Sequence, residues 1–131
     1  MLRVDHLKVR GLPPLSFAVS AGECLAIEGP SGSGKSLILR AIADLDPCEG
    51  MVFLEGAERG EMSAREWRRH VRFVAAEPAW WGDTPRQTMP PSVSLEHLMG
   101  PLALDAALLD REVRLLSSGE RQRLALVRAL A

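Results

Sequence analysis

The glycine-rich segment at residues 29–36 constrains this chain more than any other feature. It reads GPSGSGKS and fits the pattern Gly-x-x-x-x-Gly-Lys-Ser/Thr at every position. A short apolar run at 24–27 precedes it, and apolar residues at helical spacing follow it over 36–45. The patterns therefore predict a buried strand, a tight loop and a helix, in that order.

This segment has the chemistry of a phosphate-binding loop. Its glycines allow backbone conformations that other residues avoid, so successive N–H groups turn inward and form an anion cradle with the N-terminus of the next helix. Lys35 adds a mobile positive charge for the β- and γ-phosphates, and Ser36 adds a hydroxyl for Mg²⁺. The motif implies binding of ATP or GTP. The candidate ligands are Gly29, Pro30, Ser31, Gly32, Ser33, Gly34, Lys35 and Ser36.

Local patterns also predict the elements around this loop. Residues 2–9 and 15–19 alternate between apolar and polar side chains and are separated by a turn, which predicts two antiparallel strands. Ser117 and Glu120 form a capping box that opens a helix with Leu124, Val127 and Leu130 on its apolar face. The other expected elements are strands at 51–55 and 71–76, a capped helix at 63–69, a proline-rich loop at 85–91 and short helical pieces at 94–99 and 105–109.

Composition excludes several classes of protein. The 131 residues carry 16 basic and 17 acidic side chains, so the net charge of −1 provides no basic field for nucleic acid. No apolar stretch is long enough to span a membrane, and the charged N-terminal segment does not resemble a secretory signal, which predicts a cytosolic chain. The two cysteines and three histidines show neither disulfide-framework nor metal-ligand spacing.

A second motif lies at residues 115–123, which read LLSSGERQR. A capped helix N-terminus made of small residues exposes N–H groups and the positive end of the helix dipole. Residues 116–120 resemble the LSGGQ signature of the ATP-binding cassette (ABC) family, with Ser118 in place of the first Gly and Glu120 in place of the Gln. The resemblance implies that Ser117, Ser118, Gly119 and Glu120 face the γ-phosphate bound by a partner subunit.

The resemblance extends over almost the whole chain. Residues 21–23, 47–52 and 71–78 are similar to three further segments of the family. The implied fold class is α/β: a P-loop NTPase of ABC type with an N-terminal antiparallel β portion and a small helical subdomain. Domain 1–131 is then expected to be incomplete, with a nucleotide-binding core at about 1–77, the helical subdomain at about 78–116 and the signature helix at 117–131.

Three departures from the family pattern affect the expected chemistry. The Q-loop glutamine, which senses Mg²⁺ and the γ-phosphate in the family, falls at Ala76, and the neighbouring Glu77 is the candidate substitute. Residues 9–12 lack the aromatic residue on which the family stacks adenine, which leaves Arg10 as an alternative. In the family, the Walker B aspartate and the water-positioning glutamate follow the signature helix, and this sequence ends at Ala131 before reaching either of them. We therefore expect the chain to be a piece of a longer subunit, although a short folded protein stays open as an alternative.

The resemblance implies an ATP-binding subunit that powers membrane transport through ATP-driven dimerisation and Mg²⁺-dependent hydrolysis. The implied partners are an integral membrane permease and a second ATPase subunit or copy of the chain, at the cytoplasmic face of the cell membrane. Residues 80–84 weakly resemble small bacterial iron-export cassettes of the FetA type. A non-hydrolysing nucleotide-binding module and a soluble cassette ATPase acting on nucleic acid or ribosomes stay as alternatives. By itself the chain is expected not to hydrolyse ATP.

Overall fold

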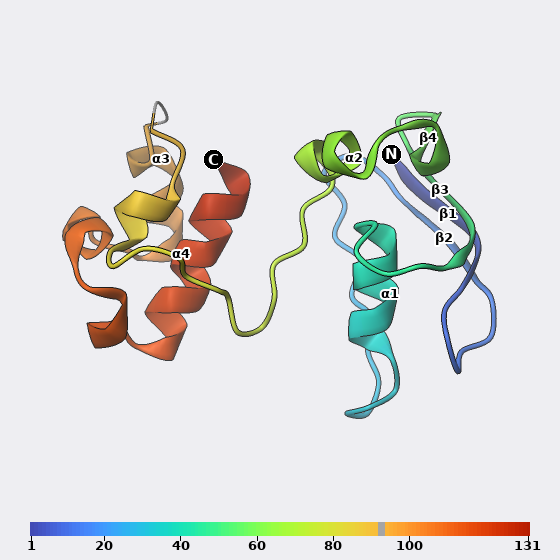
Figure 1. Ribbon diagram of the computed structural model, residues 1–131, viewed down its shortest axis with the longest axis horizontal. Coiled ribbons are helices and arrows are strands. Elements are labelled where there is room, and N and C mark those ends of the chain that lie inside the picture. The colour runs from blue at the N-terminus through green and yellow to red at the C-terminus, as the bar shows by residue number, and fades with distance from the viewer. Residues whose placement is uncertain (92–93) are drawn as a thin grey trace. The chain divides into compact units, whose positions relative to one another are not determined.

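The computed structural model describes residues 1–91 and 94–131, which divide into two compact units, Met1–Phe73 and Val74–Ala131 (Figure 1). The first unit contains a β-sheet, the phosphate loop and the helix that follows the loop. The second contains short helical turns and the helix that ends the chain. Each unit has its own cluster of buried apolar side chains.

The first unit is built on an antiparallel sheet with the strand order β2-β1-β3-β4. The predicted pairing of the first two strands is confirmed, because Leu2 lies opposite Val19 and Val4 lies opposite Phe17. Val4 is fully buried on the covered face, whereas its neighbour Arg3 is exposed. The strands are β1 (Leu2–Lys8), β2 (Leu15–Val19), β3 (Glu49–Leu54) and β4 (Ala57–Glu58).

A bulge in β1 changes which of its residues face the core. The register between β1 and β3 shifts within residues 5–8, and His6 has a φ of 49°. As a result Leu7 is fully buried and His6 is exposed. Across from the bulge, Gly50 has a φ of +92°, and a Cβ at this position would lie 2.3 Å from the His6 oxygen. The bulge therefore requires glycine at position 50.

Helix α1 (Lys35–Ile42) packs its apolar side onto this sheet. Ile38, Ala41 and Ile42 are buried in one cluster with strand residues such as Val4. Helix α2 (Ala64–His70) adds the fully buried Trp67 to the same cluster, after the single 3-10 turn η1 (Arg59–Glu61). The phosphate loop therefore precedes a helix whose apolar face is packed in the core.

Two of the expected strands do not form among the described residues. Residues 24–27 and 71–76 make no ladder hydrogen bonds, and Leu25 is 47% exposed. A strand needs a neighbour to pair its N–H and C=O groups. The four strands of the sheet pair with one another, and no other described segment pairs with either run. The expectation of two fully buried strands was wrong, since an apolar run cannot form a strand without a partner.

The second unit is stabilised by helix α4 (Ser118–Leu130), whose Leu124 and Val127 are fully buried. Leu130 is 67% exposed, so the expected apolar face ends one turn earlier than predicted. No helix among residues 1–91 and 94–131 is long and apolar enough to cross a membrane. The other elements of this unit are η2 (Pro85–Thr88), α3 (Glu96–Met99), η3 (Gly100–Leu102), η4 (Ala106–Asp110) and η5 (Val113–Leu115).

Candidate functional site

The N-terminus of α1 is open to an anion. Its N-cap is Gly34, which has a left-handed φ of 96° and no side chain that could cap the helix. In this fully described segment, the first turn of α1 contains no acidic residue. The N–H groups of that turn and the positive end of the helix dipole are therefore available to a phosphate.

Two glycines of the loop are required by its backbone and by the space around it. Gly32 has a φ of +79°, a conformation that other residues rarely adopt. At Gly34 a Cβ would be both strained and 2.8 Å from Cδ1 of Leu12, which packs against the loop. The backbone and its surroundings therefore explain glycine at positions 32 and 34.

Lys35 reaches back over its own loop. Its Nζ donates hydrogen bonds to the backbone oxygens of Gly29 at 2.6 Å and Pro30 at 2.8 Å, and lies 3.4 Å from Oγ of Ser33. The ammonium group thus lies at the loop, where it can exchange carbonyl oxygens for the more strongly attracting oxygens of a phosphate. A hollow of about 530 Å³ is lined by Ser31, Gly32, Gly34, Lys35, Ser36 and Leu37.

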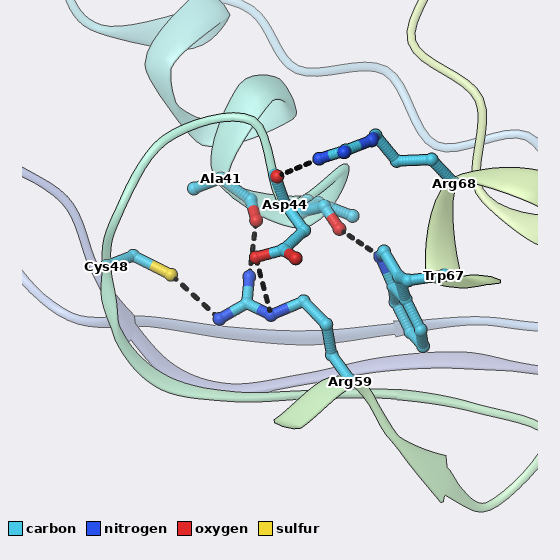
Figure 2. Close-up of polar contacts among 7 residues, drawn as sticks. Ala41, Asp44, Cys48, Arg59, Trp67 and Arg68 are labelled. Atoms are coloured by element: carbon cyan, nitrogen blue, oxygen red, sulfur yellow. Dashed lines mark hydrogen bonds and ion pairs between the residues drawn. The ribbon is translucent and has the colours of Figure 1, made fainter. Parts of the chain in front are cut away.

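The opposite end of α1 is held by three side chains from residues 59–68 (Figure 2). Arg59 donates to the backbone oxygen of Ala41, and its Nη2 lies 3.1 Å from Sγ of Cys48. Trp67 Nε1 donates to the Ile42 oxygen at 2.8 Å, and Arg68 Nη1 donates to the Asp44 oxygen at 2.7 Å. These donors bind backbone oxygens at and just after the C-terminal end of α1, where the helix pattern of hydrogen bonds ends.

Residues 9–12, where an adenine-stacking residue was expected, contain no aromatic side chain. Arg10 lines a separate hollow with Pro47 and Cys48, and none of the residues lining that hollow belongs to the phosphate loop. Leu12 instead lies against Gly34. Within the first unit, an aliphatic side chain therefore lies beside the loop, whereas Arg10 lines another hollow.

Ser36, which the sequence predicts as a Mg²⁺ ligand, places a hydroxyl at the start of α1. It is exposed in the first turn of α1. The described residues contain no group of three or more His, Cys, Asp or Glu side chains that could hold a metal on their own. Because Mg²⁺ is commonly shared between a few protein oxygens and the phosphates of a nucleotide, Ser36 fits an ion that arrives with its nucleotide.

The N-terminus of α4 differs from that of α1 because it caps itself. The predicted capping box is confirmed: Ser117 Oγ accepts from the Glu120 N–H at 3.1 Å, and Glu120 Oε1 accepts from the Ser117 N–H at 2.9 Å. The hydrogen bond from the Ser117 N–H, the Ser117 hydroxyl, and the charges of Arg111 and Arg123 hold the pKa of Glu120 below its ordinary value. Ser118 and Gly119 are exposed in the first turn, ahead of the first intrahelical N–H bond. The turn is preformed but carries its own negative charge.

The two candidate residues at the expected Q-loop belong to the second unit. Glu77 is exposed and is not part of the cradle that the first unit forms by itself. The backbone oxygen of Ala76 accepts a hydrogen bond from Nε2 of Gln122 in α4, at 2.9 Å. The structure therefore attaches Ala76 to helix α4.

The sequence did not predict the main-chain contacts that four residues of these arrangements make. Arg59 and Trp67 hold the end of α1, and Gln122 and Arg128 bind the backbone of residues 76–79. Each of them reaches a main-chain oxygen at least 18 residues away along the chain. Because every residue offers a main-chain oxygen, no residue pattern marks such a partner.

Known proteins are similar to this sequence over most of its length. A family model described as ABC transporter matches residues 12–131. The Escherichia coli K12 protein named probable iron export ATP-binding protein FetA is 34% identical over 128 residues, which cover 88% of this chain and 56% of FetA. The sulfate/thiosulfate import ATP-binding protein CysA of Rhodopseudomonas palustris is 36% identical over 140 residues, covering 93% of this chain and 39% of CysA. The chain thus spans about half the length of these relatives, or less.

Solved structures share the fold. A dimeric post-hydrolysis state of the ATP-binding cassette MJ0796, bound to ADP and Pi, superposes with a TM-score of 0.79 at 25% identity, covering 100% of this chain and 69% of that one. A bacterial Atm1-family ABC exporter with ATP bound gives a TM-score of 0.78 at 27% identity, covering 98% of this chain and 27% of that one. Both are ATP-binding cassette proteins described with a bound nucleotide.

Proposed function

Because this chain belongs to the ATP-binding cassettes of the ABC transporter family, we propose that it binds MgATP and forms the nucleotide-binding part of a transport motor. One observation carries the proposal: the uncapped N-terminus of α1 and the ammonium group of Lys35 converge on one open hollow. A preorganised positive site of this kind suits a polyphosphate.

The residues of the loop take different parts in the proposed site. The backbone N–H groups at the start of α1 receive the β-phosphate, and Lys35 turns from the Gly29 and Pro30 oxygens toward the β- and γ-phosphates. Ser36 would hold a Mg²⁺ ion through its hydroxyl. When bound, the ion would supply positive charge beside the phosphates. This role is supported by the exposure of Ser36 in the first turn of α1.

We further propose that the turn at Ser117–Glu120 completes the nucleotide site of a second cassette. The dimeric MJ0796 cassette supports this arrangement, since it has the same fold and is described with ADP and Pi. Gly119 supports it as well, because a Cβ there would meet no other atom within 4 Å in the described part of the chain. The fold of this chain does not need glycine at position 119, whereas a ligand or partner approaching the turn would.

The second proposed partner is an integral membrane permease at the cytoplasmic side of the membrane. Trp81 is 68% exposed, and its neighbour Trp80 is half-buried, which is typical of an aromatic anchor at an interface. The net charge of −1 gives no support to a nucleic acid as the partner. A non-hydrolysing nucleotide-binding module is the second candidate function, favoured by Ala76 at the position of the family's Q-loop glutamine.

Calorimetric titration of the folded chain with MgATP tests the proposal. Lys35→Ala should weaken binding by about 10-fold or more, because a charge-assisted contact contributes about 1.5–3 kcal/mol. Lys8→Ala is the matched control, since Lys8 is the other lysine of the chain and does not line the hollow at the loop. Equal affinity of wild type and Lys35→Ala would contradict the proposal. Binding without turnover in a polypeptide that includes the complete cassette would favour the non-hydrolysing module.

A further inference from the structure

The segment at residues 76–81 lies beside helix α4 and is attached to it at two points. Gln122 Nε2 donates to the Ala76 oxygen, and Arg128 Nη1 donates to the Ala79 oxygen, both at 2.9 Å. The two donors are six residues apart, which is a rise of about 9 Å along α4, and the two acceptors are three residues apart. The segment is therefore held beside the helix at two separate turns, near residues 122 and 128.

Arg128 also holds the two tryptophans that end this segment. Its guanidinium carbon lies 4.5 Å from the ring centroid of Trp80 and 4.4 Å from that of Trp81. Partial burial lowers the pKa of Arg128, although an arginine remains charged at neutral pH. A cation that is partly removed from water is attracted to aromatic faces more strongly than a fully exposed one. The contact therefore helps to fix the positions of the two rings.

The position of Trp80 is set by stacking and packing. Its ring packs against the buried apolar cluster of the second unit. Its Nε1 is buried and finds no hydrogen-bond partner among the described residues. A buried unpaired N–H is unfavourable, so the ring stays there because of the Arg128 contact and the apolar cluster.

We infer that Gln122 and Arg128 are positioning residues that attach the 76–81 segment to α4, so that a displacement of Trp81 also moves the Ser117 turn. The inference rests on the proposed function in one respect: it assumes that a partner binds at Trp81 and that the Ser117 turn receives the nucleotide of a second cassette. Neither positioning residue has a part in the proposed phosphate site. Their role is to connect the two proposed contact surfaces within one unit.

The neighbouring Arg123 supplies a matched control. It lies on the same helix and also donates to a main-chain oxygen, that of Leu102 at 3.2 Å, in a different segment of the same unit. Removing Arg123 therefore costs a comparable contact to α4 without releasing residues 76–81.

Fluorine NMR of protein containing 5-fluorotryptophan, without nucleotide, tests the attachment. The three resonances are assigned with single Trp→Phe variants. Arg128→Ala and Gln122→Ala should each shift the Trp80 and Trp81 resonances toward the unfolded position and leave the Trp67 resonance unchanged. In the Arg123→Ala control, all three resonances should stay within a line width of their wild-type positions. Unchanged Trp80 and Trp81 resonances in Gln122→Ala would overturn the inference, because stacking alone would then hold the segment.

The transmission to the helix N-terminus is tested with backbone amide shifts. Trp81→Ala, a change at an exposed side chain, should shift the amide signals of residues 117–120, and the shift should be lost in a background with both Gln122→Ala and Arg128→Ala. Equal shifts in both backgrounds would overturn it. Calorimetry with MgATP separates this inference from the proposed function. If the amide signals respond and the wild type binds no MgATP, the function fails and the attachment stands. If MgATP binds and the signals do not respond, the reverse holds.

Discussion

The indole Nε1 of Trp67 donates a hydrogen bond to the backbone oxygen of Ile42, 2.8 Å away, at the last residue of the helix that begins at the phosphate loop. Trp67 is fully buried and Ile42 nearly so, hence the contact lies within the apolar core of the first unit. It joins α2 to α1 through a main-chain atom, which makes it insensitive to the identity of residue 42. The end of α1 is thus fixed by the protein core, and its beginning stays open to a ligand.

The first prediction concerns this contact. Trp67→Phe removes the donor, leaves a buried carbonyl with one partner fewer and reduces the packed volume, so the free energy of unfolding should fall by about 2–3 kcal/mol. Urea denaturation followed by circular dichroism measures this. Arg68→Ala is the comparison, since Arg68 donates to the neighbouring Asp44 oxygen from an exposed position and should cost less than about 1 kcal/mol. A larger loss in Arg68→Ala would show that the buried bond does not dominate.

The second prediction separates fold from assembly at Gly119. Gly119→Ala should leave α4 as stable as wild type or more stable by about 0.5 kcal/mol, because alanine favours a helix and the new methyl group meets no atom within 4 Å among the described residues. In a polypeptide that carries the complete cassette, the same change should weaken ATP-dependent dimerisation measured by light scattering.

Ser117→Arg should abolish dimerisation while leaving nucleotide binding by the monomer nearly unchanged, because it removes the cap and fills the turn.

Gly100→Ala is the matched control for Gly119→Ala. Gly100 is also exposed, has a helical φ of −54°, and offers open space to a Cβ among the described residues. We expect it to leave ATP-dependent dimerisation unchanged. If Ser117→Arg and Gly119→Ala both dimerise like wild type, the turn at the start of α4 is only a helix cap.

The third prediction concerns the pH dependence that Glu120 adds to stability. Its hydrogen bonds within the capping box lower its pKa from the ordinary value of 4.5. The native state therefore binds fewer protons at this site than the unfolded state, and stability rises with pH. The contribution is fully present above about pH 4.5 and is lost as the pH falls through the lower pKa of the folded state.

Thermal unfolding between pH 7 and pH 3 measures this contribution. Glu120→Gln keeps a side chain that can accept the capping bond but does not titrate, so its stability should fall less steeply below pH 4.5 than that of wild type. Glu77→Gln alters an exposed carboxylate outside the capping box and should follow the wild-type curve. Parallel curves for wild type and Glu120→Gln would contradict the role given to the box.

The fourth prediction compares two glycines with left-handed φ. Gly50→Ala should destabilise the first unit by about 4 kcal/mol or more, since strain of 1–2 kcal/mol is joined by a collision with the main-chain oxygen of His6. Gly56 has a φ of +83° and no neighbour within 4 Å in the described part of the chain, so Gly56→Ala should cost only about 1–2 kcal/mol. Chemical denaturation of both variants decides the comparison, and equal losses would show that the bulge in β1 can relax.

The local features were predictable because each depends on residues that are close in sequence. A glycine with a left-handed φ, a serine at an N-cap and an acidic residue three positions later act through their own backbone, within one turn. For this reason the phosphate loop, the capping box at Ser117 and the alternating strands β1 and β2 follow directly from the order of residues.

Tertiary structure decided the features that depend on distant main-chain atoms. Residues 24–27 have the composition of a buried strand, yet without a paired neighbour they are not a strand among the described residues. Gln122 reaches Ala76, 46 residues away, and Arg59 reaches Ala41, 18 residues away. Since a backbone oxygen is the same in every residue, only the path of the folded chain selects which one a donor meets.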